Sequence, residues 1–231
     1  SNEEVIYKEK TAKLFYLKYK LESSEEFILV ATTRPETIFG DTAVAVNPND
    51  KRYKKLVGKK LIVPLVNRVV PIIGDKSVDS EFGTGCLKVT PAHSEKDFEI
   101  GIRNNLDIID IFNDDASLND YGMHYKSLDR FSVRKKIITE LDEKGLLDRA
   151  DDYTHNIALS ERTSCVVEPK LSTQWFVRMK KLSNPALDLV LNGDIQFYPK
   201  KYVKTYKNWL ENIRDWNISR QLYWGHRIPV F

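Results

Sequence analysis

Cysteine is scarce in this sequence, because only Cys86 and Cys165 occur among its 231 residues. Two thiols cannot build a disulfide framework, and neither has a second cysteine nearby at the spacing of a metal site. This scarcity favours a reducing compartment. We therefore expect a cytoplasmic protein that binds no metal.

Long apolar runs are missing as well. No run approaches the roughly 18 residues that a membrane span requires. The first residues also lack the basic and then apolar order of a signal peptide, so we expect no contact with a membrane. The net charge is only +3, with 30% charged residues, which permits contact with nucleic acid without indicating it.

Common catalytic patterns are absent too. No Gly-Lys-Ser/Thr follows a glycine at the spacing of a phosphate-binding loop. No serine or cysteine has a paired base with a third group to orient it, which argues against a small esterase with a protein nucleophile. Cys86, between glycine and leucine, is expected to be a small buried residue rather than a partner of His93.

Hydrophobic periodicity predicts many short strands with helices between them. The most distinct patterns are hairpins over 13–31 and 61–73 and an amphipathic helix over 129–144. Strands and helices do not alternate strictly. The pattern therefore favours an α+β fold with a small, largely antiparallel β-barrel core surrounded by helices. Further expected elements are helices over 50–57, 94–104, 185–191 and 200–213, and strands over 86–90, 107–112 and 195–198.

The first candidate segment is Thr32-Thr33-Arg34-Pro35-Glu36-Thr37, directly after an expected strand. It brings hydroxyls, a guanidinium and a carboxylate close together. The forked guanidinium of Arg34 can donate two hydrogen bonds to a phosphate or a carboxylate. A polar turn with a surface pair between Arg34 and Glu36 would explain the same residues equally well.

The second candidate segment begins at Gly83-Thr84-Gly85, whose glycines allow a ligand close to the backbone. On the strand that follows, Lys88 and Thr90 share a face. Asp97 lies in the first turn of the next helix, where it could bind a ligand or complete a capping box with Ser94. His93 could act as a general base, although a structural role is the more common one for such a histidine.

Five longer blocks carry a resemblance to a known family. They are residues 31–46, 81–93, 97–101, 167–179 and 215–230. In this order they resemble the editing insertion of class I aminoacyl-tRNA synthetases, and the resemblance runs through essentially the whole chain. The stretches 88–93 and 224–229 look like the valyl branch of that family.

The resemblance implies the fold shared by valyl, leucyl and isoleucyl editing domains. It also implies an aminoacyl-tRNA deacylase that hydrolyses threonine wrongly esterified to valine tRNA. Expected partners are the 3′ acceptor end of valine tRNA and threonine or threonyl-adenylate, with the protein as a monomer. Editing needs no cofactor. ATP and magnesium belong to the synthetic site of the full-length enzyme, whose His-Ile-Gly-His-like and Lys-Met-Ser-Lys-Ser-like segments do not occur here.

The family also implies a role for each matching residue. Asp97 would hold the substrate ammonium group, and Lys88 and Thr90 would border the amino-acid side chain. Ser94 stands where valyl enzymes commonly have aspartate, so the strength of threonine selection is open. The residues expected to bind substrate are Arg34 and Thr37 near the terminal adenosine, Phe82 against the ligand, and Thr33, Ser94 and His93.

By this resemblance, residues 1–150 form the core of the editing domain. Residues 151–214 form its remainder, and 215–231 form a junction towards a catalytic domain. Two alternatives stay open. The chain could be a binding module for the tRNA 3′ end without catalysis of its own, or an editing domain of the leucyl or isoleucyl type.

Overall fold

The computed structural model describes residues 4–220 and 224–229, and the chain divides into two compact units. The larger unit comprises Ile6–Leu171, and the smaller comprises Ser1–Val5 with Ser172–Phe231. Each unit is considered by itself. Within the described residues, no helix has the length and apolar character to traverse a bilayer.

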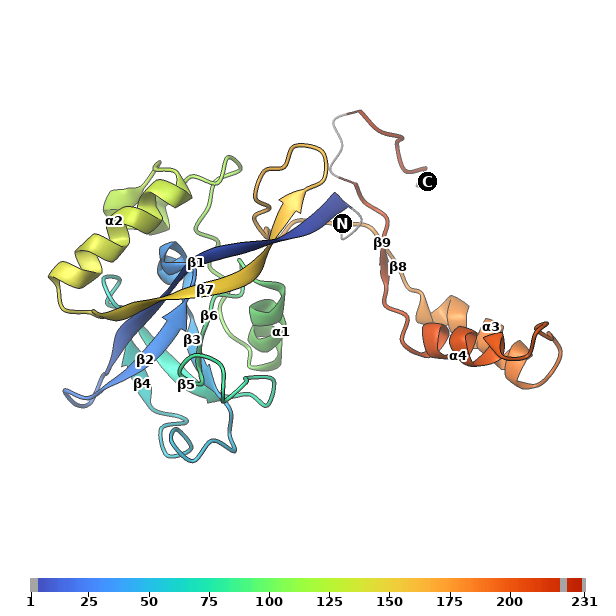
Figure 1. Cartoon of the computed structure of the whole chain (residues 1–231), viewed down its shortest axis with the longest axis horizontal. Helices are drawn as coiled ribbons and strands as arrows, with labels where there is room; N and C mark the ends of the chain where they lie inside the picture. Colours follow the sequence, from blue (N-terminus) through green and yellow to red (C-terminus); the bar gives the residue numbers. More distant parts are fainter. Residues whose placement is uncertain (1–3, 221–223, 230–231) are drawn as a thin grey trace. The chain divides into compact units, whose positions relative to one another are not determined.

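A seven-stranded sheet forms the centre of the larger unit (Figure 1). Six strands follow the order β2-β1-β4-β5-β3-β6, and β7 pairs with the long strand β1. The register is antiparallel between β1 and β2, β1 and β4, β4 and β5, and β3 and β6, whereas β3 and β5 run parallel. The strands are β1 (Val5–Leu21), β2 (Phe27–Thr32), β3 (Ala43–Val46), β4 (Lys60–Ile62), β5 (Val69–Gly74), β6 (Cys86–Val89) and β7 (Leu147–Ser160).

The long strand β1 pairs with three strands of the sheet, namely β2, β4 and β7. Phe15–Lys20 pair with β2, and Lys20 and Leu21 pair with β4. The two ends of the strand order, β2 and β6, also pack against each other. The described residues therefore form a mixed fold of helices and a curled, largely antiparallel sheet, which is consistent with the expected α+β class. The hydrogen-bonded order of the described strands is an open path, so the fully closed barrel stays a prediction.

Strand β3 lies at the centre of the core. Alternate residues of a strand point to opposite faces, and here both faces are covered. Val44 and Val46 join the larger hydrophobic cluster, and Ala43 and Ala45 join a second one. Every residue of β3 is buried, which explains why its sequence is a continuous apolar run.

Two helices and two short 3-10 helices complete the larger unit. Helix α2 (Arg130–Glu143) contributes Val133, Ile137 and Leu141 to the larger cluster, and α1 (Glu95–Arg103) contributes Ile100 to the second. The 3-10 helices are η2 (Pro35–Gly40) and η3 (Asp120–Tyr125). The predictions of helices over 94–104 and 129–144, the two hairpins and the strand over 86–90 are confirmed, with ends shifted by a few residues.

Three local predictions are wrong. Residues 50–57 form consecutive turns instead of a helix, and Asp50 Oδ1 accepts the N–H of Arg52, a local turn that competes with the helical ladder. Residues 107–112 form no strand beyond an isolated bridge from Phe112 to Leu118. Residues 195–198 form no strand either.

The smaller unit contains a helical hairpin and a short two-stranded ladder. Its elements are β8 (Phe176–Val177), α3 (Lys180–Leu191), α4 (Tyr202–Glu211) and β9 (Trp216–Asn217). Helix α3 packs against α4, and Tyr206 donates a hydrogen bond from α4 to the carbonyl of Ala186 at 3.4 Å. The helix over 200–213 is thus confirmed, whereas α3 begins at Lys180 rather than at Pro185.

Candidate functional site

Arg34 lies at the junction of β2 and η2. Its N–H donates to Oγ1 of Thr32 at 3.0 Å, and its carbonyl accepts the hydroxyl of Thr37 at 2.9 Å. Pro35 occupies the first turn of η2, where a missing N–H does no harm. Thr37 is buried and its hydroxyl holds the backbone, so it fixes the position of Arg34 rather than presenting a free donor.

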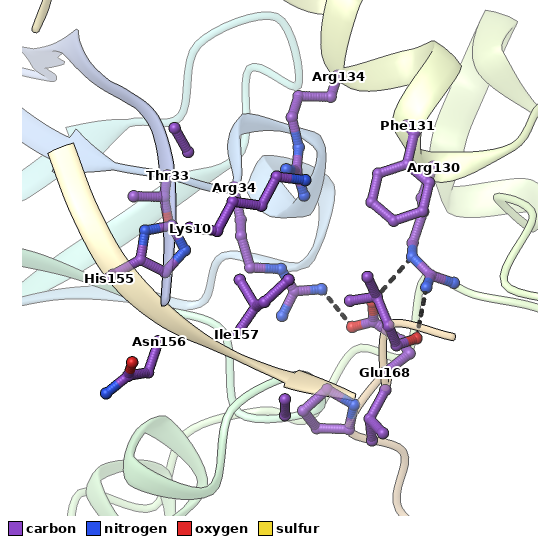
Figure 2. A pocket seen from close by; sticks show the side chains of 15 residues that line it. Lys10, Thr33, Arg34, Arg130, Phe131, Arg134, His155, Asn156, Ile157 and Glu168 are labelled. Carbon is purple, nitrogen blue, oxygen red and sulfur yellow. Dashed lines mark hydrogen bonds and ion pairs between the residues drawn. The ribbon is translucent and has the colours of Figure 1, made fainter. Parts of the chain in front are cut away.

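A cavity of about 260 Å³, which we call the arginine cavity, lies beside Arg34 (Figure 2). Its wall comes from β1, β7, the start of α2 and the turn after β2. Thr33 lines it, which places this predicted residue at a cavity. Its lining includes Lys10, Thr33, Arg34, Arg130, Phe131, Arg134, Asn156 and Glu168.

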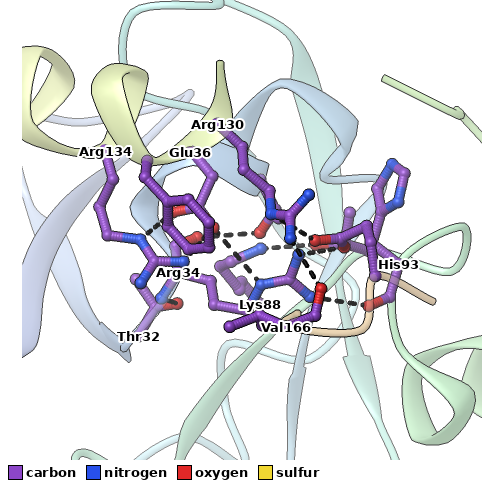
Figure 3. Close-up of polar contacts among 12 residues, drawn as sticks. Thr32, Arg34, Glu36, Lys88, His93, Arg130, Arg134 and Val166 are labelled. Atoms are coloured by element: carbon purple, nitrogen blue, oxygen red, sulfur yellow. Dashed lines mark hydrogen bonds and ion pairs between the residues drawn. The ribbon is translucent and has the colours of Figure 1, made fainter. Parts of the chain in front are cut away.

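Three arginines and two glutamates form an alternating chain beside this cavity (Figure 3). The order of this arginine–glutamate chain is Arg134, Glu36, Arg34, Glu168, Arg130. Arg134 donates two hydrogen bonds, of 2.8 and 2.6 Å, to the carboxylate of Glu36. Arg34 Nε lies 3.4 Å from the same carboxylate. Arg34 Nη2 also donates to Glu168, which Arg130 approaches to 3.4 Å.

Burial shapes the protonation of this chain. It raises the pKa of Glu168, although Arg34 and Arg130 oppose the shift. Burial also acts to lower the pKa of Arg34, but the carboxylates of Glu168 and Glu36 outweigh it and the net shift is upward. The surface pair that the sequence allowed between Arg34 and Glu36 is thus part of a larger network in which Glu36 is fully buried.

The carboxylate of Asp41 accepts three hydrogen bonds from buried side chains. Lys88 Nζ lies 2.8 Å from its Oδ1, the Thr90 hydroxyl donates to the same oxygen at 2.7 Å, and the Tyr19 hydroxyl donates to Oδ2 at 2.6 Å. All four side chains are buried. Burial, followed by the charge of Asp41, raises the pKa of Tyr19. We call these four residues the Asp41 cluster.

Asp97 lies in the first turn of α1. Its Oδ2 accepts the backbone N–H of Thr90 at 3.0 Å, and its own N–H donates to the Ser94 hydroxyl at 3.3 Å. Ser94 therefore caps the helix, whereas the carboxylate of Asp97 is directed to Thr90 instead of closing a capping box. Burial raises the pKa of Asp97, and Lys88 acts in the opposite direction. The structure thus brings Asp97, Lys88 and Thr90 together.

His93 has the environment of a structural histidine. Its Nε2 accepts the N–H of Ile111 at 3.1 Å, its ring packs edge-on against Phe112, and its carbonyl accepts Arg34 Nη1 at 3.0 Å. Burial lowers its pKa to about 4, so the ring is neutral at pH 7. With Nε2 occupied, His93 is poorly suited to take a proton from water. It instead joins Arg34 to the segment that leads into Asp97.

Phe82 lies at a different cavity, of about 190 Å³, together with Ala31, Gly85 and Cys86. The ring is about half exposed and packs edge-on against Tyr153. A side chain at Gly83 would meet the Cβ of Ala31 at 2.9 Å, and its φ of +59° favours glycine. Cys86 is buried, as expected, and burial raises its pKa to about 11, which argues against a nucleophilic thiol.

Several residues of the site were not singled out from the sequence. Tyr19, Asp41, Arg130, Arg134 and Glu168 all belong to the two networks. Only Asp41 could have been noticed in the sequence, because it is an acid two residues before the fully apolar strand β3. The other four carry no local signal, because their partners are distant in sequence. Among the described residues, no group of three potential metal ligands occurs.

Comparison with known proteins identifies the family. The family model of class I tRNA synthetases, which covers the isoleucyl, leucyl, methionyl and valyl enzymes, matches residues 1–231. The chain belongs to this family of class I tRNA synthetases.

Within the family, the chain is similar to valine–tRNA ligases along its whole length. It is 57% identical to the valine–tRNA ligase of Christiangramia forsetii over 231 residues, 56% identical to that of Bacteroides fragilis and 54% identical to that of Thermotoga maritima. It covers 26 to 27% of these proteins and so spans about a quarter of their length.

One solved structure is also similar, a leucyl-tRNA synthetase of Agrobacterium radiobacter in a ternary complex with tRNA and LeuAMS. The identity is 20%, the TM-score is 0.48, and the match covers 67% of this chain and 21% of the other.

Proposed function

We propose that this chain is the editing region of a valine–tRNA ligase, which hydrolyses the ester of threonine wrongly attached to valine tRNA. The observation that carries the proposal is the buried carboxylate of Asp97, held by Thr90 beside the Asp41 cluster. It lies in a chain that is 54 to 57% identical to valine–tRNA ligases. The curved, largely antiparallel sheet suits the editing-domain fold that the sequence predicts.

The need for such a site follows from the size of the two amino acids. Valine and threonine are nearly isosteric. A hydrophobic synthetic pocket rejects the added hydroxyl by only about a hundredfold, for which valyl-tRNA synthetases are themselves the standard example. A second site must therefore recognise the hydroxyl directly.

The Asp41 cluster has a donor and acceptor pattern that suits a hydroxyl. Thr90 gives its only hydroxyl proton to Asp41 and accepts one from Lys88 at 2.5 Å, so it retains one lone pair. Lys88 uses one N–H for Asp41 and one for Thr90, so a third remains. A threonine hydroxyl can donate to Thr90 and accept from Lys88. Valine would leave both unpaired, at a cost of about 1–3 kcal/mol each.

The chemistry of hydrolysis needs no protein nucleophile. Asp97 pairs with the substrate ammonium group and thereby fixes the ester carbonyl. Arg34, held by Glu36, Glu168 and the carbonyl of His93, positions the nucleotide end. Water attacks the carbonyl, and the ester oxygen leaves with the terminal ribose as its hydroxyl. The rate gain comes from orientation and from charge placed in advance.

A deacylation assay tests the proposal with valine tRNA charged separately with threonine and with valine. Asp97→Asn removes the charge that binds the ammonium group, and we expect kcat/KM for threonyl valine tRNA to fall at least a hundredfold. Glu99→Gln, on the exposed part of the same helix, is the matched control and should retain full activity. Hydrolysis by Asp97→Asn at the control rate would refute the role of Asp97. Tight tRNA binding without hydrolysis by the wild type would instead indicate a binding module.

A further inference from the structure

Besides the arginine cavity, the larger unit contains a cavity at the start of β5. It has a volume of about 290 Å³, and we call it the Arg68 cavity. Its wall comes from Thr42 just before β3, from Arg68 and the first residues of β5, and from residues between 105 and 109, which follow α1. Among the described residues, it shares none with the arginine cavity or with the Asp41 cluster. The proposed function therefore gives its polar groups no role.

The guanidinium of Arg68 is held in place while one of its edges stays unused. Nη1 donates to the carbonyls of Phe39 and Asp41, both at 3.0 Å. Within residues 4–220 and 224–229, Nε and Nη2 of Arg68 have no hydrogen-bonded partner. These two nitrogens form the edge that donates two parallel hydrogen bonds to a carboxylate. Because the two carbonyls already order the side chain, a carboxylate bound there costs less side-chain entropy.

Asp107 places the opposite charge at the same cavity. Among the described residues that line the cavity, Arg68 is the one base and Asp107 is the one acid. Asp107 is exposed, and its carboxylate forms neither an ion pair nor a hydrogen bond in the part of the chain that the structure describes. An anion would pair with Arg68 but be repelled by Asp107, and a cation would meet the reverse. A zwitterion can pair with both.

A buried hydroxyl adds a further polar group to the wall. Thr42 is only 7% exposed, and its Oγ1 is buried without a hydrogen-bond partner among the residues that the structure describes. Buried polar side chains nearly always have a partner, so an unmatched hydroxyl at a cavity indicates a place for a ligand atom. A carboxylate has enough acceptor sites to accept from this hydroxyl as well as from the edge of Arg68.

The rest of the wall is largely apolar. Val69 and Pro71 are two positions apart on β5, so they share a face of the sheet, and Val69 is 43% exposed. Leu106 and Ile109 line the cavity as well. Exposed apolar side chains beside convergent polar groups are typical of a small-molecule site. A volume of about 290 Å³ lies just below the usual range of such sites, so it suits a ligand of few atoms.

We propose that the Arg68 cavity binds a free α-amino acid with an aliphatic side chain. The carboxylate of the ligand accepts from Nε and Nη2 of Arg68, its ammonium group pairs with Asp107, and its side chain packs against Val69 and Pro71. This site lies outside the residues that the proposed function uses. It stands or falls independently of deacylation.

The ligand class is tested by NMR titration of the full chain with valine as the probe. A ligand of so few atoms is expected to bind at about 1 mM, so about 10 mM valine should shift the amide resonances of Val69, Leu106 and Asp107. Two analogues each lack one charge. 3-Methylbutanoate has no ammonium group and isobutylamine has no carboxylate, and each should bind about tenfold more weakly than valine.

Two of these results would overturn the proposal. If valine shifted resonances at Thr90 and Asp97 but none at Val69, Leu106 and Asp107, it would bind in the candidate editing site alone. If 3-methylbutanoate bound as tightly as valine, the cavity would be a site for simple anions and not for an amino acid.

The carboxylate at position 107 is tested by Asp107→Asn, with Asp142→Asn as the matched control. Both aspartates are exposed, and Asp142 lies on α2 outside the cavity lining. Asp107→Asn should weaken valine binding by about tenfold, because it removes the partner of the ammonium group. Asp142→Asn should bind valine like the wild type. Equal affinities of the two variants would overturn the assignment of Asp107.

The edge of Arg68 is tested by Arg68→Lys, with Arg162→Lys as the control. Lysine keeps the charge but cannot donate two parallel hydrogen bonds, so valine binding should weaken by about tenfold. Arg162 is exposed and does not line the cavity, and its replacement should have no effect. If Arg68→Lys bound valine as tightly as the wild type, Arg68 would not hold the carboxylate and the proposal would fail.

Discussion

The ammonium of Lys88 lies 2.8 Å from the carboxylate of Asp41, and the two side chains are only 7% and 0% exposed. A buried ion pair adds little net stability, because removing both charges from water offsets their attraction. Its value here is orientation, since Asp41 also accepts the hydroxyls of Thr90 and Tyr19. Asp41 therefore determines which donor and which acceptor the pair Lys88 and Thr90 can offer to a ligand.

Asp41→Asn should strongly destabilise the protein. The change leaves Lys88 as a buried charge without its counter-ion, and we expect a loss of about 3 kcal/mol in the free energy of unfolding. Urea unfolding measures it. The matched control is Asp152→Asn, which breaks a pair with Lys13 at the same distance of 2.8 Å on the surface. That change should cost less than about 1 kcal/mol, and equal losses would contradict the role of burial.

Glu36→Gln should loosen two arginines at once. Glu36 is fully buried, accepts both hydrogen bonds of Arg134 and lies against Arg34. We expect a loss of about 3 kcal/mol in unfolding free energy and weaker binding of RNA, because the guanidinium groups are no longer held. Glu25→Gln, which breaks an exposed pair with Lys20, should leave both quantities nearly unchanged. If Glu36→Gln bound RNA as tightly as the wild type, Glu36 would not be needed to hold the guanidinium groups of Arg34 and Arg134 in place.

Much of the fold was predictable because its signals are local. The helix over 129–144 has a clear apolar face and ends before Gly145, which adopts a φ of +67°. The hairpins carry turn residues between apolar runs. The prediction of a helix over 50–57 is wrong although Tyr53 and Leu56 pack against the larger cluster, because Asp50 favours a turn through its hydrogen bond to the N–H of Arg52.

The candidate site was predictable only in part, for a related reason. Residues 32–37 and 88–97 are dense in polar groups, so their importance is visible locally. The residues that orient these side chains cannot be found locally, because they are distant in sequence. Arg34 and its partner Glu168 are 134 positions apart, and Lys88 and its partner Asp41 are 47 positions apart. Lys88 and Asp41 are brought together by the pairing of β3 with β6, and no short-range pattern encodes that pairing.

Ser94 offers a test of selectivity that keeps the helix cap. Ser94→Asp preserves an N-cap oxygen, so its unfolding free energy should match the wild type within about 0.5 kcal/mol, whereas Ser94→Ala should lose about 1 kcal/mol. The added carboxylate should increase the ratio of threonine to valine deacylation, because it can accept the threonine hydroxyl. It should also raise the pKa of Asp97 further, and hence move the acidic limb of the pH–rate profile upward. An unchanged ratio would show that position 94 acts only as a cap.

His93 should make the folded protein sensitive to acid. Burial lowers its folded-state pKa to about 4, against about 6.5 in the unfolded chain, so between these values only the unfolded state binds the proton. Stability therefore falls as pH drops through this window, by about 3 kcal/mol at pH 4. The raised pKa values of Asp97 and Glu168 act with the opposite sign, because those carboxyls bind protons more readily in the folded state.

A comparison of wild type with His93→Gln isolates the histidine from these carboxyls. Glutamine does not titrate, so the difference in unfolding free energy between the two proteins should shrink as pH falls from 7.5 to 4. If that difference were constant across the window, the buried neutral imidazole would not be the cause. Deacylation by His93→Gln should keep the wild-type pH profile in shape, because an imidazole whose Nε2 already accepts the N–H of Ile111 does not activate water. Loss of the acidic limb of that profile in His93→Gln would restore His93 as the general base.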